Sequence, residues 1–248
     1  MLKNQSLYLS LALLLGGVAI FVCVPHVQKA VFIGQPTAKV LEVPDSLTSL
    51  TSVEGQRLLE TAAHKSDYAQ LVRYFRPQIY LSYCGVATGV TVANALIRKP
   101  RHTQSTWFDR LAGNTQSAYE TFFGGMTLVQ FDGLLSARGF QTQRVHGGVV
   151  SLATFRQRVV DNMQTPRDAF VINYHRSGVN QKGGGHFSPL AAYHEASDQV
   201  LILDVAAHKY PPVWAPLESV WKALDTTDKS AHAQRGFLEV EFENERLD

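Results

Sequence analysis

The sequence is poor in cysteine and in net charge, and each shortage excludes a class of protein. It has two cysteines in 248 residues and no Cys-Xaa-Xaa-Cys spacing, which excludes a disulfide scaffold. A net charge of +2, without any block of lysine or arginine, argues against a nucleic-acid-binding protein. Internal repeats and low-complexity tracts are also absent. With 45% hydrophobic and 18% charged residues, the composition indicates a globular protein of one domain, with or without a leader.

The N-terminal segment 1–30 has the pattern of a targeting or anchoring sequence. Lys3 precedes an uncharged apolar run, and Pro25 closes it. This run of about 18 apolar residues is longer than the core of a typical signal peptide and slightly shorter than a typical membrane span. A cleaved signal peptide and an uncleaved membrane anchor therefore both remain open. Either one predicts an extracytoplasmic (periplasmic) protein, secreted or anchored to the inner membrane.

Beyond the leader we expect a linker over 31–44, which shows no periodicity, and a folded domain over 45–248. The first helix is predicted after Thr51, which has capping-box spacing with Glu54. Further helices are predicted from Asp67 and from Cys84, because apolar residues then recur at helical spacing. The region from 105 to 165 also reads as mostly helical, with glycines as breaks.

After about residue 165 the spacing of the apolar residues changes from that of a helix to that of short strands. Four segments are rich in β-branched or aromatic residues: AFVINYH, HFSPLAAYH, QVLILDVAA and GFLEVEFE. The second and third are joined by EASD, which has the length of a hairpin connection. The sequence therefore predicts an α+β fold, with a helical N-terminal half and an antiparallel β C-terminal half.

Cys84 is a candidate nucleophile. A thiol reacts as its thiolate, and the start of a helix or a nearby histidine lowers the thiol pKa. Cys84 opens a predicted helix, and Gly85 leaves room for a substrate to approach the helix end. Gln78, six residues earlier, could donate from its side-chain amide to an oxyanion. The alternative is a small buried hydrophobic side chain, which is the usual role of a lone cysteine.

Two further segments supply partners for such a thiol. In GGGHFSPL, three glycines allow close approach to His186. In LILDVAAHKYPPVW, Asp204 lies late in an apolar strand, where a carboxylate needs a partner. The predicted hairpin places these strands side by side, which would let the carboxylate orient the imidazole. A satisfied core histidine and a strand-end turn residue are the alternative interpretations.

At these residues the sequence resembles phytochelatin synthase. The resemblance runs from about Thr51 to Val240. It rests on Q-x-x-x-x-Y-C-G-V-A from Gln78, on G-H-F-S-P from Gly185 and on D-V-A-x-x-K-Y-P-P-x-W-x-P-L from Asp204. The last motif is long and specific to that family.

The resemblance implies a papain-like fold, with a Cys84–His186–Asp204 triad and Gln78 in an oxyanion hole. It implies that the thiolate attacks the Cys–Gly bond of glutathione, releases glycine and forms a γ-glutamylcysteinyl thioester. Water or a second glutathione would then accept the acyl group. The predicted contacts to substrate are made by Asn173, Arg176, Gly185, Asp228 and Arg235.

The resemblance also sets expectations for cofactors and partners. No cofactor and no structural metal is expected, because the histidines form no metal-binding motif. Heavy-metal ions are expected to enter as glutathione thiolate complexes. The expected partners are glutathione and these complexes, with membrane attachment through residues 1–30 and a homodimer left open.

Two departures from the family pattern bear on the reaction. Ala207 stands where the family commonly has an arginine associated with the acceptor substrate. The cysteine-rich C-terminal region of the plant-type enzymes is also missing from this sequence. Both departures favour glutathione cleavage over phytochelatin synthesis. A different papain-like cysteine peptidase, and a non-enzymatic protein that binds glutathione or metal thiolates, are the alternatives.

Overall fold

A computed structural model describes residues 36–37, 39–113 and 115–242, and the predicted leader lies outside them. Its main sheet has seven strands in the order β1-β6-β5-β4-β3-β9-β2, and all neighbouring strands are antiparallel. The strands of this sheet are β1 Thr48–Ser49, β2 Gln141–His146, β3 Asp168–His175, β4 Gly185–His194, β5 Gln199–Ile202, β6 Val213–Pro216 and β9 Gly236–Glu241. A separate hairpin pairs β7 Thr227–Asp228 with β8 Ala233–Gln234.

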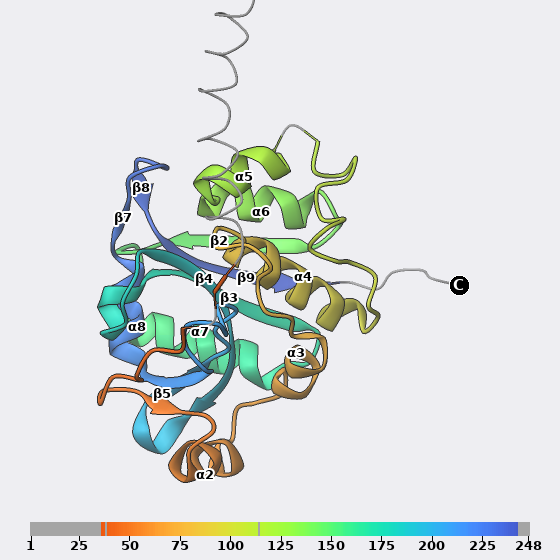
Figure 1. Cartoon of the computed structure of the whole chain (residues 1–248). Coiled ribbons are helices and arrows are strands. Elements are labelled where there is room, and N and C mark those ends of the chain that lie inside the picture. The colour runs from red at the N-terminus through yellow and green to blue at the C-terminus, as the bar shows by residue number, and fades with distance from the viewer. Residues whose placement is uncertain (1–35, 38, 114, 243–248) are drawn as a thin grey trace, which may run out of the picture.

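Helices cover both faces of the sheet (Figure 1). The α-helices are α2 Val53–Thr61, α3 Tyr68–Tyr74, α4 Cys84–Ile97, α5 Ala118–Gly124, α6 Leu128–Ser136, α7 Leu152–Gln164 and α8 Leu217–Leu224. Two short 3₁₀ helices follow strands, η1 Arg176–Val179 and η2 Glu195–Ser197. In the part of the chain that the structure describes, no helix has both the length and the apolar character needed to cross a membrane.

The central strands divide their side chains between two hydrophobic cores. In β3, Ala169 and Val171 pack with helices α3, α4 and α6, whereas Phe170 and Ile172 pack with helices α7 and α8. This alternation follows from the two-residue period of a strand. It explains why β3 and β4 are buried on both faces and read as nearly continuous apolar segments.

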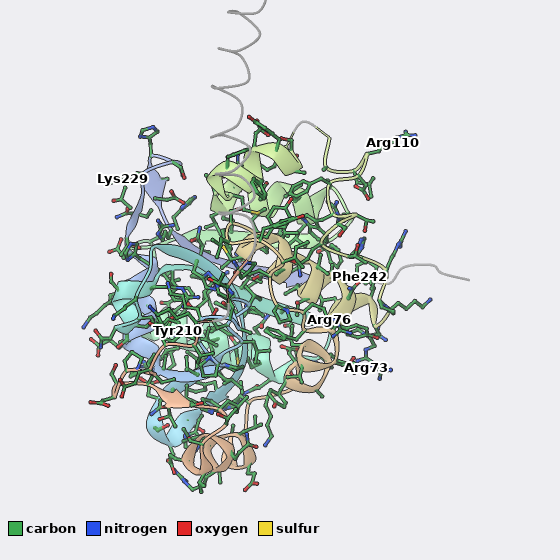
Figure 2. All side chains as sticks on the ribbon, in the orientation of Figure 1. Arg73, Arg76, Arg110, Tyr210, Lys229 and Phe242 are labelled. Carbon is green, nitrogen blue, oxygen red and sulfur yellow. The ribbon has the colours of Figure 1, made fainter. Side chains whose placement is uncertain are left out.

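Helix α4 lies inside the first core. Every residue from Gly85 to Leu96 is buried, so the helix is apolar around most of its circumference. A side chain at Gly85 would collide with Met126, and one at Gly89 would collide with Trp107. These glycines allow close packing at the end of the helix that carries Cys84. Figure 2 shows how side chains fill the space between the layers, while Arg110 and Lys229 project from the surface.

The structure confirms the α+β class and the division into a helical first half and an antiparallel second half. It corrects three details. The cap of α2 is Ser52, which accepts from the Gly55 N–H, and not Thr51. Strand β2 interrupts the region predicted as helical; it is a largely exposed edge strand, QTQRVH, without an apolar face to signal it. Strand β5 ends at Ile202, so Asp204 follows the strand.

The linker predicted over 31–44 has no helix or strand where it is described. It nevertheless contacts the domain, because the Lys39 and Leu41 N–H groups donate to the carbonyls of His208 and Lys209 at 3.1 and 2.9 Å. These bonds place the segment beside the loop that follows Asp204.

We predict that Gly89→Ala destabilises the fold although alanine is the better helix former. The new Cβ would lie 2.7 Å from Cζ2 of Trp107, whose ring is buried and covered by the Arg138 guanidinium at 4.1 Å. Overpacking costs about 1–3 kcal/mol, and the helix gain of about 1 kcal/mol offsets only part of it. Urea unfolding followed by circular dichroism measures the difference.

The matched control is Gly124→Ala in α5, where an added Cβ has no neighbour within 4 Å. It should leave stability unchanged or slightly raised. Equal unfolding midpoints for the two variants would contradict the packing argument.

Candidate active site

Cys84 is the first residue of α4, and its thiol is free and partly exposed. Its N-cap, Tyr83, makes no side-chain capping bond. The N–H groups of a helix's first turn have no acceptor within the helix, and together they carry partial positive charge. A negative charge on the Cys84 sulfur, or on an oxygen bound next to it, is therefore stabilised at this end of the helix.

The hairpin β4–β5 brings His186 to Asp204. His186 is the second residue of β4, and the Leu203 N–H donates to the Pro189 carbonyl at 3.1 Å just beyond the end of β5. His186 Nε2 lies 2.8 Å from Asp204 Oδ1. Since a carboxylate only accepts, Nε2 carries a proton and Nδ1 remains to face Cys84. The predicted adjacency of these two residues is thus observed.

Asp204 is fully buried and accepts hydrogen bonds on both carboxylate oxygens. Arg176 donates to it twice, from Nη1 at 2.7 Å and from Nη2 at 2.8 Å, and the Ala206 N–H donates at 2.9 Å. Burial acts to raise the pKa of Asp204, but His186 and Arg176 outweigh it and hold the pKa well below its usual range. The group is therefore an anion at any pH at which the protein would work.

The Arg176 side chain is itself buried among other residues. Its guanidinium also donates to Gln181 Oε1 and lies 5.4 Å from the centre of the Tyr210 ring. Only 4% of the side chain is exposed, and it does not line the cavity described below. The sequence predicted a substrate contact for this residue; the structure places it behind Asp204, where it positions the carboxylate.

The environment favours a charged pair between Cys84 and His186. Burial acts to raise the pKa of the Cys84 thiol, but the hydrogen bond and charge of His186, the Phe187 N–H and the charge of Arg176 lower it below its ordinary value. Burial and Arg176 act to lower the pKa of His186, but Asp204 and the hydrogen bond to Cys84 raise it overall. These opposite shifts favour a thiolate next to an imidazolium.

Cys84 and His186 open onto a cavity of about 340 Å³ with one polar and one apolar side. The polar side is formed by four residues that the sequence predicted as substrate contacts, Asn173, Gly185, Asp228 and Arg235, together with Ser230. The apolar side is formed by Leu81, Phe123, Met126 and the adjoining glycines. Residues from five separate segments of the chain therefore meet at this cavity.

The charges on the polar side are already paired. Arg235 Nη1 lies 3.1 Å from Asp228 Oδ2 and donates to Asn173 Oδ1 at 3.3 Å. Ser230 donates to Asp228 Oδ1 from both its N–H and its hydroxyl. A Cβ at Gly185 would collide with the Arg235 guanidinium, so a larger residue there would require that guanidinium to shift. The result is an anion and a cation held side by side near Cys84.

Gln78 occupies a different position from the one expected. Its side-chain amide donates to the carbonyls of Tyr80 and Leu81 at 2.8 and 2.9 Å, and it is absent from the residues that line the cavity. In this arrangement Gln78 stabilises the loop before Cys84. The Cys84 N–H at the start of α4 is the donor that lies next to the thiol.

Sequence reasoning missed three contributors to the site. Ser230 could have been found from the sequence, because Asp-x-Ser is a common turn pattern and Ser230 donates to Asp228. Met126 packs against Gly85, and Tyr174 meets the His186 ring edge to face at 5.8 Å. These two are ordinary apolar positions in the sequence and become recognisable only in three dimensions.

The described residues contain no cluster of three or more histidine, cysteine, aspartate or glutamate side chains that could hold a metal ion. The site around Cys84 combines one thiol with one imidazole already engaged by Asp204. Its geometry suits acyl transfer by a thiolate.

The α+β domain carries its cysteine at the start of a helix and its histidine on the antiparallel sheet that faces this helix. A likeness to the peptidase domain of Streptococcus ComA covers 67% of this chain and 96% of that domain, at 14% identity and a TM-score of 0.42.

Comparison with known families gives a more specific result. The model of the family described as phytochelatin synthase matches residues 38–237. Glutathione gamma-glutamylcysteinyltransferase 3 of Lotus japonicus is 33% identical over 81% of this chain and 43% of its own length. The corresponding protein of Schizosaccharomyces pombe is 28% identical over 71% of this chain and 43% of its own. The chain belongs to the phytochelatin synthase family, and it spans about two fifths of the length of these relatives.

We predict that Cys84 is alkylated at lower pH than an ordinary thiol. Because its pKa is lowered, the rate of reaction with iodoacetamide should rise with pH at a midpoint below the value of about 8.5 for a free thiol. In His186→Ala the midpoint should move to higher pH, because fewer favourable contacts then offset the effect of burial on the Cys84 thiol. Mass spectrometry of the Cys84 peptide measures the rate separately from Cys23. A midpoint at or above that of the unfolded chain would contradict the charged pair.

We predict that Arg176→Met destabilises the protein strongly. Removing one partner of a buried ion pair leaves an uncompensated charge and costs about 3–5 kcal/mol. Arg176→Lys should recover only part of the loss, because an ammonium cannot make the two-point contact to Asp204. Urea unfolding gives the free energies.

The matched control is Arg156→Met, which removes a similar two-point contact to Asp198 at the surface. Exposed pairs contribute about 0–1 kcal/mol. If both methionine variants lose the same stability, the buried pair has no special role.

Proposed function

We propose that this chain is a glutathione γ-glutamylcysteinyltransferase that acts through a thioester on Cys84. The observation that carries the proposal is the meeting, in one cavity, of a thiol with a lowered pKa and a fixed anion–cation pair. The names of the relatives in the family support the substrate class. The position of each group supports the steps that follow.

The polar side of the cavity suits the γ-glutamyl head of glutathione. That head carries an α-ammonium and an α-carboxylate, so it requires one anion and one cation. Asp228 would receive the ammonium, and Arg235 would receive the carboxylate. Asn173 Nδ2 is buried and has no hydrogen-bond partner among the described residues, so it is a further donor for the carboxylate. A volume of about 340 Å³ is within the range of small-ligand sites.

With the head bound there, the Cys–Gly peptide bond would lie at Cys84. The sulfur attacks the carbonyl carbon, and the thiol proton resides on His186 Nδ1. The carbonyl oxygen becomes an oxyanion, which the Cys84 N–H at the start of α4 stabilises. When the C–N bond breaks, His186 gives the proton to the departing amine of glycine. Asp204 keeps the imidazole oriented throughout.

The thioester is then consumed by an acceptor. A water molecule gives γ-glutamylcysteine, and the thiolate of Cys84 leaves. Transfer to a second glutathione would need a cation to hold its carboxylates, and Ala207 offers none at the position where the family commonly has arginine. We therefore propose that hydrolysis predominates over phytochelatin synthesis.

Metal ions and location form a second set of proposals. Heavy-metal ions would enter as glutathione thiolate complexes, without a protein cofactor. Residues 1–30 would place the domain outside the cytoplasm as a signal peptide or anchor. These proposals rest on the sequence alone.

We predict that brief mixing with glutathione, followed by an acid quench, leaves a γ-glutamylcysteinyl mass on the Cys84 peptide. Free glycine should appear in at least equal amount. Cys84→Ala should lower glycine release by at least about a thousandfold, because the nucleophile of such a triad acts as a unit with its base. Mass spectrometry and amine analysis measure both quantities.

The control is Cys23→Ala, which should form the adduct normally. Glycine release that persists in folded Cys84→Ala would contradict the proposal. Intact glutathione with cleavage of a different peptide would indicate another cysteine peptidase. Binding of glutathione without an adduct would indicate a binding protein.

A further inference from the structure

A second cavity, larger than the one around Cys84, lies against the loop that leads to that residue. Its volume is about 420 Å³, compared with about 340 Å³ for the first. It is enclosed by the end of α3 and the loop that follows, the second half of α4, and the segment 100–105. No residue lines both cavities, so the second one is a separate place at which a molecule could bind.

Two buried amides hold the walls of the second cavity in place. Asn94 Nδ2 donates to the His102 carbonyl at 2.9 Å, and Asn94 Oδ1 accepts from the His102 N–H at 2.8 Å. Gln104 makes a similar contact with the loop that follows α3. Its Oε1 accepts from the Ile79 N–H at 3.0 Å, and its Nε2 donates to the Pro77 carbonyl at 2.8 Å. The cavity is therefore formed before any ligand arrives, as is usual for small-molecule sites.

One part of the lining is apolar. It consists of an aromatic ring, two prolines and two branched side chains: Tyr74, Pro77, Ile79, Val90 and Pro100. Tyr74 and Val90 are buried, whereas Ile79 is 39% exposed at the edge of the cavity. A ligand with an apolar body would remove this surface from water, which favours binding.

The polar groups that remain for a ligand are mainly donors. Arg76 donates once, to the Phe75 carbonyl at 2.6 Å, so other N–H groups of its guanidinium are unused. The His102 ring and the Ser105 hydroxyl also line the cavity and make no hydrogen bond to the described residues. The lining contains no aspartate or glutamate. These groups suit an anion, since a charged donor binds a charged acceptor most strongly.

The surface around the second cavity is positively charged. The chain has no aspartate or glutamate from residue 68 to residue 108, and this stretch contains five cations: Arg73, Arg76, Arg98, Lys99 and Arg101. All five are exposed, and none forms an ion pair with the described residues. Figure 2 shows Arg73 and Arg76 on the same side of the molecule. Such a surface attracts anions to the cavity.

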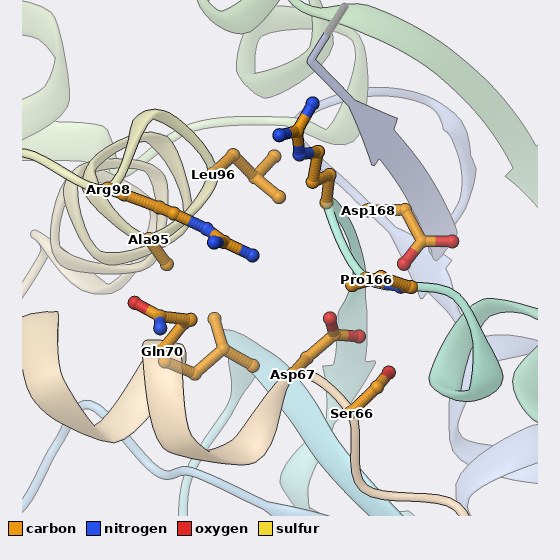
Figure 3. A pocket seen from close by; sticks show the side chains of 10 residues that line it. Ser66, Asp67, Gln70, Ala95, Leu96, Arg98, Pro166 and Asp168 are labelled. Atoms are coloured by element: carbon orange, nitrogen blue, oxygen red, sulfur yellow. The ribbon is translucent and has the colours of Figure 1, made fainter.

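The carboxylates at the two ends of this stretch face other cations. Asp109 lies 3.1 Å from Arg138 Nη2. Asp67 lines a separate pocket of about 20 Å³ together with Asp168 and Arg98 (Figure 3). Because Arg98 reaches into that pocket, we assign its charge to those two carboxylates. Arg76 has no acidic side chain beside it in the lining of the second cavity, so its charge is available to a ligand.

We propose that the second cavity binds a small organic anion that consists of a carboxylate on an aromatic or branched apolar body. The carboxylate would lie at Arg76, and the body would pack against Tyr74 and Val90. The ligand class excludes amino acids, because the lining offers no anion to an α-ammonium group. In this respect the second cavity differs from the one at Cys84, where Asp228 and Arg235 present both charges.

His102 should make binding depend on pH. Burial, and then the charges of Arg138 and Arg101, lower the pKa of His102, while Asp109 opposes them. The ring is therefore neutral at pH 8 and gains a proton as the pH falls. A bound carboxylate stabilises the protonated ring, so binding should tighten between pH 8 and pH 5.5. Arg76 stays charged over this range and gives the affinity that does not depend on pH.

The test uses the probe 4-(trifluoromethyl)phenylacetate and the full-length protein in mild detergent, with detergent alone as the blank. The fluorine NMR signal of the probe should broaden saturably when protein is added. Arg76→Gln should weaken binding by about threefold or more, as expected for a partly exposed ion pair, and His102→Gln should remove the tightening at low pH. The matched control is Arg110→Gln, an exposed arginine outside the cavity, which should bind as the parent does.

Two analogues with the same apolar body test the ligand class. The corresponding alcohol lacks the charge, and 4-(trifluoromethyl)phenylalanine adds an α-ammonium group. Each should bind about threefold or more weakly than the probe, because the cavity offers a cation for the carboxylate and no anion for the ammonium.

Four results would overturn the proposal. Folded protein that broadens the signal no more than detergent does would show that the cavity takes no such anion. Binding that is unchanged in Arg76→Gln, or equal for the alcohol, would remove the role of the charge. Weakening in Arg235→Gln in place of Arg76→Gln would locate the probe in the cavity around Cys84. Because no outcome involves glutathione, the result is independent of the proposed reaction.

Discussion

The buried contact between Asp204 and Arg176 is the constraint on which the site depends. A carboxylate without exposure to water is tolerable only when both oxygens are satisfied, and here Arg176, His186 and a backbone N–H satisfy them. The contact fixes the imidazole through Nε2, and this leaves Nδ1 for Cys84. Arg176 thus helps to orient His186, which carries the proton, although Arg176 itself does not line the cavity.

The sheet explains why these groups meet. Side chains alternate between two cores along β3, so the strand can stay buried on both faces while Asn173 at its far end reaches the cavity. The adjacent β4 carries His186, and the hairpin to β5 returns the chain to Asp204. Helix α4 packs on the same face and presents Cys84 at its first turn. Cys84, His186 and Asn173 are therefore positioned by rigid elements, and Asp204, in the loop after β5, is fixed by its contact with Arg176.

The sequence predicted the parts that depend on local pattern. The helix from Cys84 and the adjacency of His186 and Asp204 across the β4–β5 pair follow from periodicity and a hairpin-length connection, whereas the family resemblance implied the place of Cys84 beside them. The role of Arg176 could not be predicted, since an arginine after a strand looks the same whether it faces substrate or a buried aspartate. Strand β2 was missed because an exposed edge strand carries little apolar signal.

Helix α4 carries partial charges of opposite sign at its two ends. Its first turn presents free N–H groups to Cys84, which favours a negative sulfur, whereas its last turn is capped by the Arg98 N–H, which donates to the carbonyls of Ala95 and Asn94. Both ends lie in or near the core, where water screens these partial charges weakly. The uncapped first turn is therefore the end at which the helix dipole acts on the nucleophile.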